Sequence, residues 1–124
     1  MPFVTITATP GLSADQKKQL LLRSSETVVQ TLSAPQHSVR VVLHELPEGH
    51  YLNGGEFGMP TIMYEVDMIA GRTEEQKAAL IAALGPAAHE VTGVPVAEVR
   101  ARITDFPNTN MGMANGITAK QAGR

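Results

Sequence analysis

The chain repeats itself at an interval of sixty residues, and this repeat constrains the fold more than any other feature. Residues 11–17 read GLSADQK, and residues 71–77 read GRTEEQK. The same offset aligns three further pairs of segments, which are 34–35 with 94–95, 38–40 with 98–100 and 45–47 with 105–107. Self-similarity at a fixed spacing indicates duplicated structural units. We therefore predict two copies of one β-α-β unit within one compact domain, at residues 1–58 and at residues 59–124, the second ending in a polar tail.

Strand patterns mark the start and the end of each copy. Apolar and polar residues alternate over residues 3–8, as in a strand with one buried face. Further strand patterns occupy residues 39–44, 61–69 and 96–104. Parallel strands that are joined by a helix cross over right-handedly. Two such units side by side predict an α+β fold with a four-stranded sheet and two helices on one face.

Each predicted helix begins with the same signal. Ser13 with Gln16, and Thr73 with Gln76, have the spacing of a capping box, in which two side chains satisfy free backbone amides. Apolar residues then recur at helical spacing to about residues 32 and 91, before the prolines at 35 and 95. The uncovered face of the sheet calls for a partner, most simply other subunits, and we expect an oligomer.

Composition excludes several classes of function. The chain has 124 residues, no cysteine and a net charge of −2, which gives no electrostatic reason to bind nucleic acid. No apolar run has the length of a membrane span, and no signal peptide precedes the first strand, so we expect a cytoplasmic protein without a membrane partner. The four histidines lack the spacing of metal ligands, and we expect no metal site.

Proline at position two gives the chain a special amine. A small second residue favours removal of Met1, which leaves Pro2 with a free secondary amine. This is the only proline nitrogen in the chain that can take up a proton, because every other one is part of an amide. Burial and nearby arginines are expected to lower the pKa of a terminal amine from its ordinary value near 8. Pro2 is therefore a candidate base at neutral pH.

The motifs resemble a known family. Residues 32–56, which read LSAPQHSVRVVLHELPEGHYLNGGE, resemble the C-terminal half of 4-oxalocrotonate tautomerase. The start of the chain, with Pro2, a strand, Gly11 and a capped helix, resembles its N-terminal half. The second copy looks like a diverged unit, so the chain is similar to fused members of the tautomerase superfamily, a group that includes cis-3-chloroacrylic acid dehalogenase. The resemblance implies a tautomerase/MIF-like fold, a homotrimer of fused chains and no cofactor.

The resemblance assigns the catalytic proline to Pro2. In the unfused tautomerase an arginine follows the glycine after the first strand. That position is Leu12 in the first copy but Arg72 in the second, and the dehalogenase has an arginine that matches Arg72. The resemblance therefore implies that Pro2 and Arg72 are catalytic residues.

Three further site residues follow from the resemblance. The arginine of the SVRV segment is Arg40, a predicted catalytic residue, and its second-copy equivalent is Arg100. The aromatic residue of the glycine-rich hairpin is Tyr51. We expect Arg72, with Arg40 or Arg100, to bind the carboxylate and 2-oxo groups of a small carboxylate substrate, and Tyr51 to close the apolar side.

The implied function is that of an isomerase. Proton transfer between the enol and keto forms of a small 2-hydroxydienoate needs a base near neutral pKa and a cation beside the developing enolate. A dehalogenase or hydratase is an alternative, although the position of the water-activating glutamate of the dehalogenase falls on Met113. A non-catalytic oligomeric binding protein is a second alternative, which retention of Met1 would favour.

The first prediction concerns the amino terminus. We expect the purified protein to lack Met1, because the small ring of Pro2 permits its removal. Intact mass spectrometry measures this directly. A mass that includes Met1 leaves no free proline amine and contradicts the role of Pro2.

Overall fold

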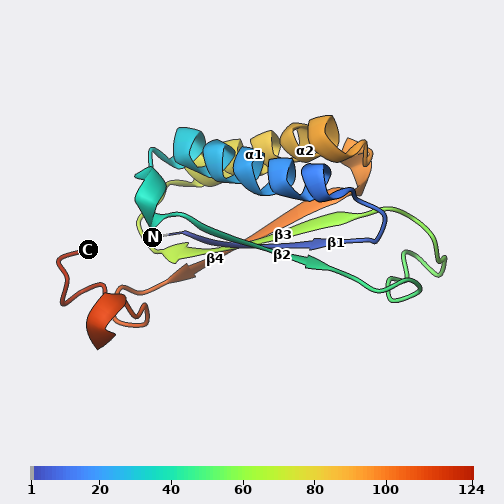
Figure 1. The fold of residues 1–124 in the computed structure, drawn as a ribbon. Coiled ribbons are helices and arrows are strands. Elements are labelled where there is room, and N and C mark those ends of the chain that lie inside the picture. The colour runs from blue at the N-terminus through green and yellow to red at the C-terminus, as the bar shows by residue number, and fades with distance from the viewer. Residues whose placement is uncertain (1) are drawn as a thin grey trace.

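The computed structural model describes residues 2–124 and confirms the predicted fold class (Figure 1). Its helices and strands are β1 (Phe3–Ala8), α1 (Ala14–Leu32), β2 (Arg40–Glu45), β3 (Ile62–Ile69), α2 (Glu74–Thr92) and β4 (Val99–Phe106). Short 3-10 helices occupy Gln36–Ser38, Val96–Glu98 and Ala114–Gly116. The four strands form one sheet, and both helices cover the same face of it.

The two units meet through their first strands. The strand order is β2-β1-β3-β4, with β1 parallel to β2, β3 parallel to β4, and β1 antiparallel to β3. Thr5 pairs with Glu65, its own counterpart in the repeat, so the two units are related by an approximate two-fold axis at this pair. Phe3 therefore pairs with Asp67 at one end of the sheet, and Ala8 pairs with Ile62 at the other. At each end of the sheet, the first strand of one unit therefore begins beside the place where the first strand of the other unit ends.

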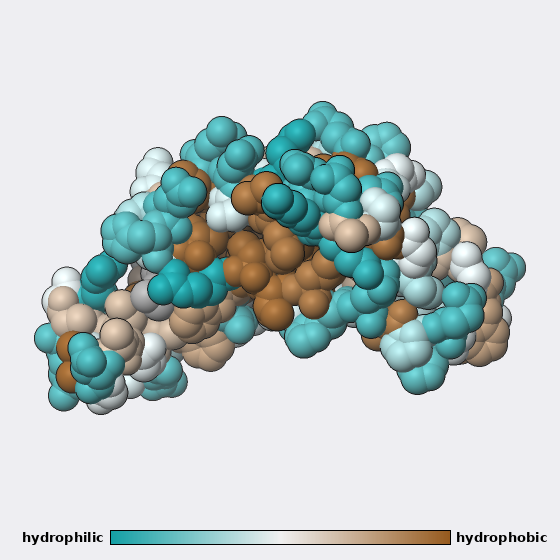
Figure 2. Space-filling view, viewed as in Figure 1, coloured by the Kyte–Doolittle hydropathy of each residue, from teal (hydrophilic) through white to brown (hydrophobic). Residues whose placement is uncertain are grey.

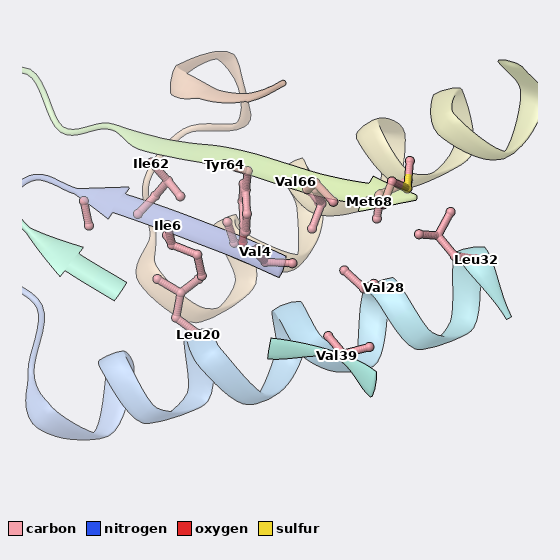
Figure 3. Close-up of a cluster of buried hydrophobic side chains, with 14 of the residues drawn as sticks. Val4, Ile6, Leu20, Val28, Leu32, Val39, Ile62, Tyr64, Val66 and Met68 are labelled. Carbon is pink, nitrogen blue, oxygen red and sulfur yellow. The ribbon is translucent and has the colours of Figure 1, made fainter. Parts of the chain in front are cut away.

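A single core lies between the sheet and the helices (Figure 3). Alternate residues of β1 and β3 point toward the helices and are buried, which is the period of two that a strand imposes. The labelled members from these strands are Val4, Ile6, Ile62, Tyr64, Val66 and Met68, and α1 adds Leu20, Val28 and Leu32. Burial of these side chains, at roughly 25 cal/mol per Å² of apolar surface, is the main force that holds both units together.

Both helices start at the predicted caps. The Ser13 hydroxyl accepts a hydrogen bond from the amide of Gln16, and the Gln16 side chain accepts one from the Ser13 amide. Thr73 and Gln76 repeat this arrangement at the start of α2. These reciprocal bonds fix where each helix begins, and therefore fix the short turn between each first strand and its helix.

Two segments differ from the predictions. Residues 96–98, predicted as the start of the last strand, form a 3-10 helix, in which the Glu98 amide donates to the carbonyl of Pro95 at 2.8 Å. The residues after 118, predicted as a polar tail, fold back on the segment that follows β4. The Lys120 amide donates to the carbonyl of Asn108 at 3.1 Å, and the Arg124 amide donates to the carbonyl of Ala119 at 2.8 Å. Local backbone hydrogen bonds therefore order both segments.

The connection between the units contains the predicted hairpin. Asn53 and Glu56 exchange two backbone hydrogen bonds, of 2.9 and 3.0 Å, around Gly54 and Gly55. Both glycines have positive φ, which a two-residue hairpin turn of this kind requires. The hairpin lies at the end of the sheet where β1 finishes, and the segment after β4 lies at the end where β1 starts (Figure 1).

Both α-helices lie on one face of the sheet, and within residues 2–124 no strand covers the opposite face. Its residues include Val42 on the edge strand β2, which is 46% exposed. A second apolar area lies elsewhere, because Figure 2 shows apolar atoms gathered between the helices and the sheet, and Leu22 of α1 is 49% exposed. Within residues 2–124, neither helix is long and apolar enough to cross a membrane.

The second prediction concerns Tyr64 in the core. Its hydroxyl lies 2.8 Å from that of Ser24, and burial raises the pKa of Tyr64 to about 12, although the Ser24 hydrogen bond opposes the shift. Because the folded pKa lies above the unfolded value near 10, the stabilisation is complete below pH 10 and is lost between pH 10 and 12. The shift corresponds to at most about 2.7 kcal/mol. Urea unfolding measured from pH 8 to 11.5 should show this loss.

The Tyr64→Phe variant is the control for this prediction. It lacks the titrating group, so its stability should fall less steeply above pH 10, while at pH 8 it should be about 1 kcal/mol less stable because Ser24 loses its partner. Parallel curves for the two proteins above pH 10 would show that Tyr64 does not titrate as its burial implies.

Candidate active site

The end of the sheet where β1 starts brings Pro2 next to Arg40. The ring of Pro2 is fully buried. Its carbonyl accepts a hydrogen bond of 3.1 Å from the backbone amide of Arg40, the first residue of the parallel strand β2. The parallel pairing of β1 and β2 therefore places the two predicted site residues on adjacent strands. Met1 lies outside the described residues, and its removal stays a prediction.

Arg72 reaches the same end of the sheet from the second unit. It follows β3, whose last residues lie beside the start of β1 because the two strands are antiparallel. Gly71, at a φ of 136°, turns the chain, and Thr73 caps α2 immediately after Arg72. Arg72 is half-buried, and its Nε is buried without a hydrogen-bond partner among residues 2–124. A buried donor that lacks a partner in the protein is a position where a ligand can bind.

Arg40 is exposed and engages no carboxylate in the part of the chain that the structure describes. Its Nη1 donates a hydrogen bond of 2.6 Å to the carbonyl of His37. The guanidinium has five N–H donors, so most of them remain available to a bound anion. A shallow hollow beside it is lined by Gln36, His37 and Val39. Pro2, Arg40 and Arg72 thus share one end of the sheet.

Arg100 and Tyr51 lie at the opposite end. Arg100 pairs with Met63 near the start of β3, and its Nη1 lies 3.4 Å from Oε2 of Glu98. Tyr51 belongs to the hairpin segment and lines a hollow of about 150 Å³ with Thr9 and Pro10. The six residues of β1 separate the two ends by about 20 Å. One chain therefore does not bring Arg100 or Tyr51 to Pro2.

The repeat identifies one further residue at the Pro2 end, which the motifs of the sequence did not predict as a site residue. Met111 lies sixty positions after Tyr51 and is therefore its counterpart in the second unit. Met111 is buried in the segment that follows β4. This segment lies at the end of the sheet where β1 starts (Figure 1). The sixty-residue offset relates Met111 to Tyr51 in the sequence. The antiparallel pairing of β1 and β3 is needed to show that Met111, and not Tyr51, lies at the Pro2 end.

Comparison with known proteins identifies the family. The model of the tautomerase enzyme family matches residues 2–58 and matches again over residues 64–120. The chain belongs to the tautomerase family. A 2-hydroxymuconate tautomerase from Pseudomonas putida is 47% identical over 60 residues, which are 48% of this chain and 94% of that protein. One unit of the chain thus corresponds to nearly the whole of that relative.

Solved structures match both units together. The crystal structure of Pt0534 inactivated by 2-oxo-3-pentynoate is 63% identical, covers 98% of this chain and 99% of its own, and has a TM-score of 0.96. The symmetric trimer of the wild-type Q0 fused 4-OT is 40% identical with the same coverage and a TM-score of 0.94. N1, from the cis-3-chloroacrylic acid dehalogenase family, is 18% identical over 94% of this chain and 82% of its own, with a TM-score of 0.85, and shares the fold. The protein is a fused tautomerase and thus an isomerase.

The third prediction tests the turn that positions Arg72. Gly71 and its counterpart Gly11 both have positive φ, and a Cβ at either position would meet no atom within 4 Å. Gly71→Ala and Gly11→Ala should therefore each cost about 1–2 kcal/mol through backbone strain alone. Gly71 directly precedes Arg72, so the expected role of Arg72 predicts that tautomerase activity falls in Gly71→Ala at least ten times further than in Gly11→Ala.

Two measurements check this pair of variants. Urea unfolding reports the strain, and an ultraviolet assay of ketonisation reports the activity. Equal losses of activity in the two variants would contradict a specific role for the Arg72 turn, because the two glycines share the same backbone constraint.

Proposed function

We propose that the protein catalyses enol–keto tautomerisation of small 2-hydroxydienoates or related enol acids, with the amine of Pro2 as the base. The observation that carries this proposal is the buried Nε of Arg72, which lacks a partner among residues 2–124 and lies at the same end of the sheet as Pro2. A buried cationic donor at the same end of the sheet as an amine suits an anionic substrate that must exchange a proton.

The reaction moves one proton and one double bond. The Pro2 nitrogen takes the proton from the 2-hydroxyl group, and the electron pair of that O–H bond forms the carbonyl. The carbon–carbon double bonds shift along the chain of the substrate, and the proton on Pro2 is delivered to the terminal carbon of the shifted system. Pro2 returns to its neutral form, so the cycle consumes no co-reactant. The buried ring of Pro2 limits the orientations that the amine can adopt.

The arginines supply the positive charge. We assign Arg72 to the developing enolate and the 2-oxo group, since its Nε is shielded from water. Arg40 is the better candidate than Arg100 for the substrate carboxylate. Arg40 lies at the Pro2 end without a carboxylate partner among the described residues, whereas Arg100 lies at the other end beside Glu98. Arg100 and Tyr51 can act in a Pro2 site only if another copy of the chain presents them.

Two relatives support the substrate class. The 2-hydroxymuconate tautomerase is named for an enol acid of this kind. Pt0534 is inactivated by 2-oxo-3-pentynoate, a small 2-oxo acid whose alkyne is open to attack by a nucleophile. Both compounds combine a carboxylate with an oxygen at the neighbouring carbon, which is the group that a pair of arginines recognises.

The uncovered face of the sheet supports a homotrimer. Q0 fused 4-OT is a symmetric trimer, and this chain has the same fold over nearly its whole length. In a cyclic trimer each interface joins two different surfaces of neighbouring copies. Such contacts would cover Val42 and Leu22, which one chain leaves exposed.

The fourth prediction tests the assignment by variants. Pro2→Ala keeps a terminal amine but loses the ring, and Arg72→Ala removes the shielded cation, so each should lower kcat/KM for 2-hydroxymuconate by roughly 10²–10⁴-fold. Arg40→Ala should raise KM by about ten-fold or more, because it removes a carboxylate contact. Arg23→Ala is the matched control, because Arg23 is an exposed arginine that pairs with Glu90 between the helices, and it should change kcat/KM less than three-fold.

The readouts are ultraviolet assays with 2-hydroxymuconate and phenylenolpyruvate, and intact mass after treatment with 2-oxo-3-pentynoate. The adduct should map to Pro2. Wild-type rates in Pro2→Ala and in a form that keeps Met1 would overturn the proposal. Halide release from 3-haloacrylates without ketonisation of either enol acid would favour a dehalogenase instead.

A further inference from the structure

The approximate two-fold axis gives the Pro2 end of the sheet a counterpart at the other end. Arg40 opens β2 at the first end, and Arg100 occupies the equivalent position in β4 at the second. The two arginines differ in their partners. Arg40 bonds to a backbone carbonyl, while Arg100 bonds to the carboxylate of Glu98. The residue that stands in the place of Glu98 in the first unit is Ser38, which carries no charge.

Glu98 is held in place by two other parts of the chain. The side chain of Asn53, in the hairpin, donates a hydrogen bond of 3.0 Å to Oε2 of Glu98. The hydroxyl of Thr61 donates one of 3.1 Å to the Glu98 carbonyl. The Glu98 side chain is only 19% exposed, whereas that of Arg100 is 62% exposed. The carboxylate is thus the anchored member of the pair, and the arginine folds onto it.

We propose that Glu98 closes a second acid-binding site at this end of the sheet, so that each chain offers a small carboxylate one site instead of two. The carboxylate of Glu98 occupies the position beside Arg100 that a ligand's carboxylate would take. It also repels a second anion, because like charges a few ångströms apart oppose each other strongly where water is partly excluded.

Two further differences between the ends agree with this closure. The Pro2 end has two arginines, Arg72 and Arg40. Their counterparts at the second end are Leu12 and Arg100, so only Arg100 of these two positions carries a guanidinium there. Asn53 has Met113 as its counterpart in the repeat, and the thioether of methionine has no N–H that could hold a carboxylate beside Arg40. The inference goes beyond the proposed activity, since it concerns binding at an end that lacks Pro2.

The fifth prediction tests the closure by binding rather than by turnover. Glu98→Gln keeps an oxygen that can accept the Asn53 hydrogen bond but removes the charge, so the hairpin should stay in place. In the wild type, 2-oxoglutarate should shift the backbone amide resonances of Phe3 and Arg40 only. In Glu98→Gln it should also shift those of Val99 and Arg100, with an affinity at that end at least about ten-fold above the wild-type value.

The double variant Glu98→Gln/Arg100→Gln is the control and should lose the response at Val99. Equal affinities at the two ends of the wild type, or no response at Val99 in Glu98→Gln, would overturn the inference. The proposed function is judged separately, because it predicts the response at Phe3 and Arg40 in all three proteins. Amide spectra without ligand establish that each variant is folded.

Discussion

The antiparallel pairing of β1 with β3 is the constraint on which the rest of the molecule depends. It joins the two units into one sheet and reverses the direction of the second relative to the first. The end of β3 therefore lies beside the start of β1, and the turn that follows β3 brings Arg72 to the end of the sheet where Pro2 precedes the first strand. The candidate site therefore combines Pro2 and Arg40 of the first unit with Arg72 of the second.

The burial of both units in one core maintains this pairing. Tyr64 and its neighbours on β3 share the core with Val4 and Ile6 on β1, so neither unit can shift along the other without exposing apolar surface. A slip of one residue would turn every buried side chain of a strand to the open face. The core therefore fixes the register that places the turn with Arg72 at the end of the sheet where β1 starts.

Duplication gave two equivalent ends, and the residues at these ends have become different. One end has Pro2, Arg72 and an arginine, Arg40, that engages no carboxylate among the described residues. The other has Leu12 in place of Arg72 and pairs Arg100 with Glu98. The two units share the same backbone fold. These few differences in side chains account for the chemistry proposed at the first end and for the closed site proposed at the second.

Sequence alone determined the elements and the residue types available for chemistry. The alternation of residues 3–8 and the capping boxes are local patterns that the sequence shows directly, the sixty-residue offset shows that they occur in two copies, and the structure contains the predicted strands and helices. Only the tertiary structure decided which candidates meet, because β-strand pairing joins residues sixty positions apart. It brings Arg72 to the Pro2 end and leaves Arg100 and Tyr51 at the other end, which a list of motifs along the chain cannot reveal.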